Sequence, residues 1–339
     1  MAPPTAVITG ASSGIGLALT KHLLSLGWCV AMADINPPQE DLGNRTLYVR
    51  TDVTSWSQQA SLFDEAYKWQ GRLDFFAANA GIDDRDDIFN SISSDKPPKQ
   101  PNMMCFDVNL VGQYYGIKLA AHYMSLDSTA GKAKRGGKIV VTSSGAGIYP
   151  SPFAPQYAAS KHALVGLVRS LAPISAPVVQ NSLEATARTR CTQDMETEIN
   201  GVTCCYLALA RENELTCPPQ NSRNIRINAI CPALVRTGLA PPGLLEQFKD
   251  EQLTPMETML RCFSTLADFE NVGKADWVES GKNGETVEGN LTDLIWHQPP
   301  QPPPEKSYQD EEGQKAWAKI YHERNRKFAE ADWESEKQV

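Results

Sequence analysis

The chain has 339 residues and a formal net charge of −8, with 41% hydrophobic and 21% charged residues. This size and balance predict a globular protein with one large domain and additions to it. The negative charge argues against a nucleic-acid partner, which selects a basic surface. No run of about 20 apolar residues suits a membrane span, and no secretory signal precedes the first apolar run. We therefore expect a cytoplasmic protein with no nucleic-acid or membrane partner.

Short apolar strands and helices alternate along the first part of the chain. Residues 5–10 form a strand that runs into a glycine turn, and apolar residues then recur at helical spacing until Gly27. The elements that follow are strands at 29–33 and 47–49, a helix at 56–69 and a strand at 73–77. Alternation of this kind predicts a parallel sheet that helices cover on both faces.

The pattern continues after an irregular, proline-bearing stretch over residues 83–101. One long helix is predicted over residues 103–126, followed by a loop rich in glycine and lysine. The remaining predicted elements are a strand at 138–142, a helix at 157–171, a strand at 225–230 and a last, edge strand at 286–288. Together these elements predict an α/β fold, a Rossmann-like doubly wound parallel sheet in a single domain over residues 5–295.

An irregular insertion over residues 174–223 separates a helix from a strand that a compact unit joins with a few residues. It is interpreted as a surface insertion, as a cap over the substrate cleft, or as a gene-model artefact such as retained intron sequence. The eight cysteines of the chain show no Cys-x-x-Cys spacing, so reduced thiols and no metal are expected. A zinc site is disfavoured at the four cysteines of the insertion, Cys191, Cys204, Cys205 and Cys217.

A proline-rich linker and a helix are predicted over residues 296–339. Residues 298–304 consist of proline and glutamine and favour a stiff polyproline II spacer. The residues that share one face of the helix beyond it are Trp317, Ile320, Tyr321, Arg324 and Phe328. This face is expected to pack on the parent domain or on a sister subunit, and a motif for an outside partner is the alternative.

The turn between the first strand and the first helix reads Thr9-Gly10-Ala11-Ser12-Ser13-Gly14-Ile15-Gly16. A glycine-rich turn of this kind presents backbone N–H groups and a helix N-terminus to a pyrophosphate. Gly10 permits the tight turn, Gly14 lets the phosphate approach, and Gly16 lets the helix pack closely on the strand. The hydroxyls of Ser12 and Ser13 add hydrogen-bond donors. The turn therefore predicts a dinucleotide site.

The dinucleotide is predicted to be NAD rather than NADP. Asp34 ends the second strand, where a carboxylate accepts hydrogen bonds from the adenosine ribose hydroxyls and repels a 2′-phosphate. The two residues after it provide no cation that would hold such a phosphate. Asp52 closes the third strand and is expected to meet the adenine amino group, with Val53 beside the ring.

Three residues in the middle of the chain predict proton transfer at an alcohol or carbonyl oxygen. Tyr157 and Lys161 are four residues apart on a helix, so their side chains point the same way. The Lys161 ammonium is expected to lower the pKa of Tyr157 from its usual value of about 10. Ser144 precedes them and would orient the substrate oxygen. The predicted reaction is proton abstraction from an alcohol by Tyr157 as hydride leaves for a nicotinamide, or the reverse.

These motifs resemble those of the short-chain dehydrogenase/reductase family, over about residues 5–172 and 224–295. The resemblance rests on the glycine turn, the segment Asn79-Ala80-Gly81, the Ser-Tyr-Lys set and the upstream Asn109. The catalytic tetrad that it implies is Asn109, Ser144, Tyr157 and Lys161. The predicted cofactor contacts, from the residues and from the resemblance, are Gly10, Ser12, Ser13, Gly14, Ile15, Gly16, Asp34, Asp52, Val53, Asn79, Ala80, Gly81, Tyr157, Lys161, Val235 and Thr237.

Further expectations follow from the same resemblance. Within the family, the chain is similar to the NAD-dependent 15-hydroxyprostaglandin dehydrogenase-like members, including fungal ones. Asn109 is expected to bend the long helix around a water that connects Lys161 to solvent, and the subunits are expected to pair through helices as a homodimer or homotetramer. The chain departs from the family pattern at Ala78, where an Asn is usual, and at Ala233, where a Gly follows the proline.

The leading hypothesis is an NAD(P)-dependent oxidoreductase, of class EC 1.1.1.-, that interconverts a secondary alcohol and a ketone. Its substrate is expected to be a small molecule of lipid or secondary metabolism, because the apolar segment over residues 239–248 is expected to cover the cleft. The alternative hypothesis is a dinucleotide-binding protein whose catalysis is impaired by the 174–223 insertion.

Overall fold

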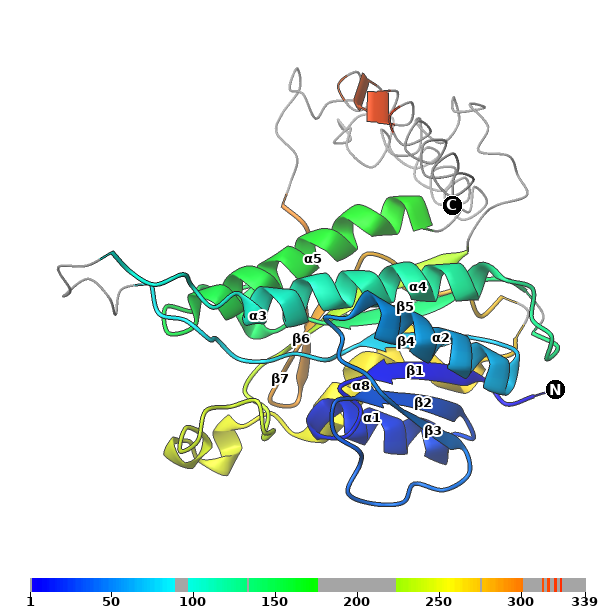
Figure 1. Ribbon diagram of the computed structural model, residues 1–339, viewed down its shortest axis with the longest axis horizontal. Coiled ribbons are helices and arrows are strands. Elements are labelled where there is room, and N and C mark those ends of the chain that lie inside the picture. The colour runs from blue at the N-terminus through cyan, green and yellow to red at the C-terminus, as the bar shows by residue number, and fades with distance from the viewer. Residues whose placement is uncertain are drawn as a thin grey trace, which may run out of the picture. The chain divides into compact units, whose positions relative to one another are not determined.

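The computed structural model describes residues 2–88, 97–132, 134–175, 224–274 and 276–300 (Figure 1). It also describes six positions near the C-terminus, which are Gly313, Ala316, Trp317, Ile320, Tyr321 and Arg324. The chain divides into two units, Met1–Pro177 with Ser222–Gln298 and Val178–Asn221 with Pro299–Val339. The predicted insertion, apart from its first two residues, lies outside the described residues, and so do its four cysteines.

The first unit is built on one eight-stranded sheet with the order β3-β2-β1-β4-β5-β6-β7-β8. The strands are β1 (Thr5–Thr9), β2 (Cys29–Asp34), β3 (Thr46–Arg50), β4 (Phe75–Ala78), β5 (Gly137–Thr142), β6 (Ile225–Pro232), β7 (Thr286–Asn290) and β8 (Asp293–Trp296). The pairs from β3 to β7 are parallel, and β8 is antiparallel to β7. The predicted Rossmann-like parallel sheet is therefore confirmed.

The prediction that residues 286–288 form the last, edge strand is wrong. The chain turns at Leu291, whose φ is +49°, and returns as β8 along the outer side of β7. Strand β8 has only four residues, and a segment of this length is too short to show a clear alternation of apolar and polar side chains. The sequence therefore did not predict β8. The β7–β8 hairpin therefore makes β7 an interior strand of the sheet, with β8 at the edge.

Helices cover both faces of the sheet, as predicted, with α2, α4 and α5 on one face and α1 and α8 on the other (Figure 1). Their bounds are α1 Gly14–Ser25, α2 Trp56–Gln70, α3 Met104–Phe106, α4 Gln113–Ser125, α5 Pro155–Ser175 and α8 Met256–Ala267. The sequence did not predict α8. Its buried Met259, Cys262, Phe263 and Leu266 nevertheless recur at helical spacing, which was a legible signal.

The predicted long helix over residues 103–126 is present but changes its winding. It begins as α3, passes through a π-helical turn, η1 (Asp107–Gly112), and continues as α4. A π turn inserts extra backbone into a helix and is frequent at functional sites. Asn109 lies in this turn, so the winding of the helix changes at the residue where a bend was expected.

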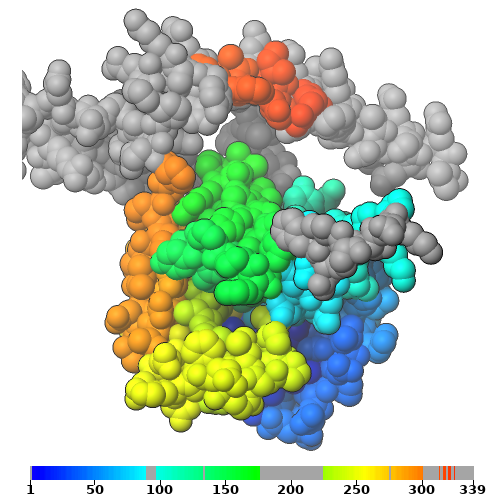
Figure 2. All heavy atoms as spheres, turned by 90° about the vertical axis from the view of Figure 1, so that its left-hand side faces the viewer, coloured from blue at the N-terminus to red at the C-terminus, as the bar shows by residue number. Residues whose placement is uncertain are grey.

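The strand order reverses between β1 and β4. The chain winds from β1 outward to β3 and then returns to form β4 on the other side of β1. In doubly wound sheets, ligands bind at the carboxyl ends of the strands where the order reverses. Figure 2 looks onto this edge of the first unit, where residues of the α5 entry (green), the 236–255 segment (yellow) and the loop after β4 (cyan) meet.

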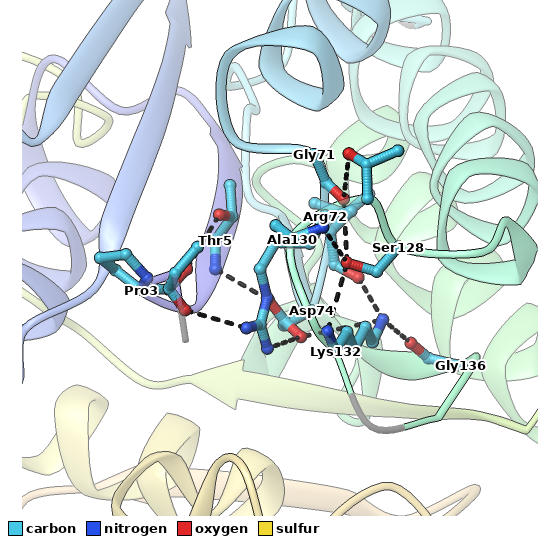
Figure 3. A network of polar contacts seen from close by, with 12 residues as sticks. Pro3, Thr5, Gly71, Arg72, Asp74, Ser128, Ala130, Lys132 and Gly136 are labelled. Carbon is cyan, nitrogen blue, oxygen red and sulfur yellow. Dashed lines mark hydrogen bonds and ion pairs between the residues drawn. The ribbon is translucent and has the colours of Figure 1, made fainter.

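The opposite edge of the sheet holds a buried ionic network (Figure 3). The Asp74 carboxylate accepts hydrogen bonds from Arg72 at 2.8 and 2.9 Å and from the Thr5 backbone N–H at 2.9 Å. Lys132 lies 3.8 Å away and donates to the carbonyl oxygens of Leu73 and Gly136. The network ties the first strand, the entry to β4 and the loop before β5 together, far from the carboxyl edge.

Among the described residues, no helix combines the length and apolar character that a membrane crossing requires. The same part of the chain contains no cluster of side chains suited to hold a metal ion.

Candidate active site

The glycine turn follows β1 and leaves the start of α1 open. Gly10 and Gly14 have φ values of +66° and +52°, which residues with a Cβ rarely adopt. A Cβ at Gly16 would collide with the Gly10 carbonyl oxygen, so the helix can begin directly against the strand. The N-cap residue Ser13 makes no side-chain capping bond. The first N–H groups of α1 are therefore left for a ligand.

Polar groups beside the turn fit a dinucleotide. The Ser12 hydroxyl is buried without a hydrogen-bond partner among the described residues, and a buried hydroxyl calls for one. Asp34 ends β2, and its carboxylate accepts the backbone N–H of Ser12 at 3.1 Å and of Asn36 at 3.1 Å. The Asp34 carboxylate is thus fixed next to the turn, where it would face the adenosine ribose of a dinucleotide whose pyrophosphate bound at the turn.

The segment Asn79-Ala80-Gly81 leaves β4 beside the turn. The Thr9 hydroxyl accepts the backbone N–H of Asn79 at 3.0 Å and of Ala80 at 3.1 Å, and the Asn79 amide donates to the Thr9 carbonyl at 3.0 Å. A Cβ at Gly81 would lie 3.3 Å from both Asn109 Oδ1 and Lys161 Nζ. The missing side chain therefore lets this segment pass close to the predicted catalytic residues.

Asn109 holds the backbone that follows this segment. Its side chain is fully buried. Its Oδ1 accepts the Ile82 N–H at 2.8 Å, and its Nδ2 lies 2.9 Å from the Ile82 carbonyl oxygen and 3.1 Å from Ser160 Oγ. Asn109, in the π turn, thus connects the loop after β4 to α5 through hydrogen bonds. The predicted water link from Lys161 to solvent stays a prediction.

Ser144, Tyr157 and Lys161 converge at the carboxyl end of β5. Ser144 caps a short 3₁₀ turn, η2 (Gly145–Gly147), by accepting the Ala146 N–H at 3.1 Å, and its side chain lies close enough to Tyr157 to lower the pKa of the phenol. Lys161 Nζ lies 5.5 Å from the centre of the Tyr157 ring and donates to the Thr142 carbonyl at 2.9 Å. The three predicted side chains therefore form one cluster.

Burial dominates the ionisation of this cluster. Burial raises the pKa of Tyr157 to about 12, although the hydrogen bond with Ser144 lowers it. Burial also lowers the pKa of Lys161 to about 8. The pKa of Tyr157 was predicted to fall, but it rises, because the removal of water disfavours the phenolate more than the nearby groups stabilise it. The first proton of the pair therefore leaves near pH 8.

The remaining predicted contacts lie around this edge at different depths. A Cβ at Gly14 would be 3.3 Å from the Thr237 methyl group, so the segment after β6 lies against the glycine turn. Val235 is buried and pairs with Thr254.

The Asp52 carboxylate, after β3, accepts hydrogen bonds from the Thr54 N–H at 2.9 Å and from the Thr54 hydroxyl at 2.8 Å. Val53 is buried next to Gly112, and Ile15 is partly buried against the apolar core.

The sequence did not indicate Asp84. One of its carboxylate oxygens accepts the backbone N–H of Gln156 at 3.0 Å and of Tyr157 at 3.4 Å. Asp84 therefore caps the first turn of α5 and fixes the backbone of Tyr157. No local signal could have revealed this role, because 72 positions separate Asp84 from Gln156, and the capping rules concern neighbours in sequence.

Comparison with known proteins defines the family. A family model described as short chain dehydrogenase matches residues 4–197. The chain is 28% identical to short-chain dehydrogenase/reductase prx6 of Penicillium rubens over 320 residues, covering 88% of this chain and 87% of the relative. It is 30% identical to short-chain dehydrogenase/reductase ascJ of Acremonium egyptiacum, covering 83% and 80%. It is also 32% identical to the NADP-dependent dehydrogenase M3 of a Phoma species, over 51% of this chain and 65% of that relative.

Solved structures share the fold. The 3-ketoacyl-(acyl-carrier-protein) reductase of Brucella melitensis, complexed with NADH, superposes with a TM-score of 0.57 at 18% identity, covering 85% of this chain and 96% of the other. The chain thus belongs to the short-chain dehydrogenase family, whose members are NAD(P)-dependent oxidoreductases with a Rossmann-like fold. The likeness to 15-hydroxyprostaglandin dehydrogenase-like members stays a prediction.

Proposed function

We propose that this oxidoreductase interconverts a secondary alcohol and a ketone, with Tyr157 as general acid and base. The observation that carries this proposal is the grouping of Ser144, Tyr157 and the buried ammonium of Lys161 at the carboxyl end of β5. Two hydroxyls and one cation around a common point suit the oxygen of an alcohol or carbonyl group. This arrangement supports the proposed CH–OH substrate class, EC 1.1.1.-.

Each residue of the predicted tetrad has a separate task. In oxidation, Tyr157 removes the alcohol proton, and in reduction it returns a proton to the same oxygen. Ser144 donates a hydrogen bond to that oxygen and orients it, Lys161 supplies positive charge beside the phenolate, and Asn109 holds the loop that passes over them. A nicotinamide dinucleotide, when bound, supplies the hydride acceptor or donor.

The proposed cofactor is NAD, with NADP as the lesser candidate. The support is the Asp34 carboxylate, fixed beside the glycine turn by the N–H groups of Ser12 and Asn36, since a carboxylate there repels a 2′-phosphate. The name of the Phoma relative indicates NADP for that protein. Comparing kcat/KM with the two cofactors decides between them. Asp34→Ala should reduce the preference for NAD, and a better rate with NADP in the wild type would show that the argument from Asp34 is wrong.

The proposed substrate is a small apolar alcohol or ketone, in lipid or secondary metabolism. Apolar side chains are exposed on the segment beside the site, at Leu239, Leu244 and Phe248, and Phe153 is 96% exposed in the loop before α5. Exposed apolar groups around a cleft favour an apolar ligand. The fungal origin of the relatives supports secondary metabolism.

We further propose that the protein forms a homodimer or homotetramer in the cytoplasm. An apolar hollow on the outer side of η1, α4 and α5 supports helix pairing between subunits, and its lining residues are Leu110, Val111, Tyr114, Ala163 and Leu167. The four described cysteines are free, as a reducing compartment would require. Light scattering of the wild type and of Tyr114→Glu tests the pairing, since a charge in the hollow should yield monomers. The domain over residues 5–295 and the extension over 296–339 stay proposals.

A dehydrogenase assay over a panel of secondary alcohols, with NAD and with NADP, tests the proposed function. Tyr157→Phe should lower kcat by at least about 100-fold, since it removes the proton acceptor, and should leave the binding of NADH, measured by its fluorescence, unchanged. The alternative is the dinucleotide-binding protein with impaired catalysis. It predicts enhanced NADH fluorescence with no turnover on any alcohol, and a Tyr157→Phe variant identical to the wild type.

A further inference from the structure

A buried carboxylate lies next to the candidate site and has no part in the proposed chemistry. Glu288, in β7, is 1% exposed. Its Oε2 accepts hydrogen bonds from the Tyr149 hydroxyl at 2.9 Å and from His297 Nε2 at 2.7 Å, and its Oε1 accepts the Asn290 amide at 2.9 Å. A buried carboxylate is costly unless donors surround it, and three donors are assembled around this one.

One of these donors belongs to the turn that carries Ser144. The turn begins at Ser144, whose carbonyl accepts the Gly147 N–H at 2.8 Å, and it ends at Tyr149, whose N–H donates to the Gly145 carbonyl at 2.8 Å. Tyr149 is 49% exposed, yet its hydroxyl reaches inward to the buried Glu288. The hydrogen bond to Glu288 raises the pKa of Tyr149. The turn is therefore fixed at one end by β5 and at the other by Glu288.

The sheet register also relates Glu288 to the first end of the turn. Cys231 of β6 pairs with Glu288, and its thiol is buried beside Ser143 and Ser144, at the start of the turn. The register pairs the preceding residue, Ile230, with Thr142, which lies two residues before Ser144, so Glu288 is two strands away from the start of the turn. The carboxylate therefore contacts the end of the Ser144 turn directly, through Tyr149, and lies two strands away from its start.

The other two donors come from the β7–β8 hairpin and hold the carboxylate still. Asn290 ends β7, and His297 follows β8 and packs its ring against that of Tyr149, with 5.9 Å between ring centres. The backbone of His297 is fixed in turn, because Arg169 of α5 donates to its carbonyl at 3.0 Å. The carboxylate is therefore a rigid acceptor, which a positioning role needs.

We propose that Glu288 is a positioning residue for the reaction, holding the Ser144 turn in its catalytic geometry through the Tyr149 hydroxyl. This proposal rests on the proposed function of Ser144. Neither Glu288 nor Tyr149 is required to touch the reacting atoms. Their contribution is the fixed placement of the Ser144 hydroxyl, and small misplacements of a reacting group reduce rates strongly.

The test compares four variants with the wild type in the intact protein. Tyr149→Phe and Glu288→Ala should each lower kcat on the order of 10-fold, with the KM for the dinucleotide unchanged. The double variant should lose no more than either single one, because both remove the same link. Glu288→Gln should recover most of the rate, since its amide oxygen accepts from Tyr149 and the Asn290 amide can rotate to face its NH₂ group.

Tyr67→Phe is the matched control, because the Tyr67 hydroxyl donates to the Asp127 carbonyl at 2.7 Å, away from the site. It should keep the wild-type kcat. A wild-type kcat in Tyr149→Phe, or an equal loss in Tyr67→Phe, would overturn the proposal.

Amide hydrogen exchange of residues 143–149 separates this proposal from the proposed function. Exchange should accelerate in Glu288→Ala and in Tyr149→Phe but not in Tyr67→Phe. If the wild type oxidises no alcohol, the proposed function fails, and the exchange result still decides whether Glu288 holds the turn. Unchanged exchange in both variants would overturn the positioning role, whatever the activity.

Discussion

Lys161 Nζ lies 5.5 Å from the centre of the Tyr157 ring, so we expect the protons held by the two residues together to set the pH dependence of the reaction. The pKa of Lys161 is about 8 and that of Tyr157 about 12. The state that accepts a proton from an alcohol has one proton fewer than the fully protonated pair. That proton leaves near pH 8, and the remaining one can reside on the nitrogen, which leaves the phenolate as base.

The first prediction follows from this order of ionisation. At limiting alcohol, the oxidation rate should rise with pH and level off above about pH 8, whereas the rate of ketone reduction should be constant below this pH and fall above it. Initial rates from pH 6 to 10 measure both profiles. Lys161→Met should remove the break near pH 8, so that its residual oxidation rate continues to rise. A break retained in that variant would show that another group titrates.

Lys138 is a lysine of β5 whose side chain is buried in the folded protein. Its ammonium is 1% exposed, has no hydrogen-bond partner among the described residues and lies 4.6 Å from the centre of the Trp277 ring. Burial lowers its pKa to about 8 from 10.5. Between these values the unfolded chain holds the proton and the folded protein does not, so the free energy of unfolding gains up to about 3 kcal/mol as pH rises.

Lys138→Met should therefore stabilise the protein at pH 7 by roughly 1–3 kcal/mol and should lose this advantage by pH 10. Denaturant unfolding at the two pH values measures the difference between variant and wild type. Buried thiols such as Cys262, whose pKa is raised to about 12, lower stability above pH 9, but they act equally in both proteins. The exposed Lys21→Met serves as the control, and an effect of equal size there would contradict the prediction.

At the scale of elements, α5 depends on a cap that comes from another part of the chain. Asp84 accepts the backbone N–H groups of Gln156 and Tyr157 at the first turn of this helix. Asp84→Ala should destabilise the protein by about 1 kcal/mol, as the loss of an N-cap does, and should also lower kcat, because the Tyr157 backbone loses its anchor. Thermal unfolding and steady-state rates measure the two effects.

Asp41→Ala is the control for Asp84. The Asp41 carboxylate also accepts a backbone N–H, from Gly43 at 2.8 Å, but in an exposed loop away from the site. Its loss should leave kcat unchanged. If the two variants lost activity equally, Asp84 would have no special bearing on Tyr157.

The elements that the sequence predicted are those whose signals are local. The glycine turn needs left-handed backbone angles at Gly10 and Gly14, and only glycine provides them readily. Tyr157 and Lys161 share a helix face by their spacing alone. Asp84 and Glu288 gave no such signal, because the partners that link them to the site, Gln156 and Tyr149, lie 72 and 139 positions away. The pKa of Tyr157 was mispredicted for a related reason, since its burial depends on the whole fold.

At the scale of the whole molecule, the two edges of the sheet have different tasks. The carboxyl edge contains the glycine turn and the buried hydroxyl of Ser12, which has no hydrogen-bond partner among the described residues. Such unpaired polar groups are what a binding site needs for its ligand. The opposite edge holds the Asp74 network, where ionic groups are paired (Figure 3). Polar groups left for ligands reduce stability, so closed networks elsewhere help to maintain the fold.

Asp74→Ala should destabilise the whole first unit by about 3–5 kcal/mol, because it leaves Arg72 and Lys132 buried without their carboxylate. Both cationic side chains are 6% exposed, and burial has already lowered the pKa of Lys132 to about 8. The variant also loses the acceptor of the Thr5 N–H, so β1 should exchange its amide hydrogens faster. Denaturant unfolding measures the loss of stability.

The control is Asp64→Ala. Asp64 forms an ion pair with Lys68 at 2.6 Å, the shorter distance, but the two side chains are 45% and 74% exposed. An exposed pair contributes at most about 1 kcal/mol, so this variant should unfold almost as the wild type does. Equal destabilisation by the two substitutions would mean that burial does not set the strength of the Asp74 network, and the assignment of stability to the edge opposite the site would fail.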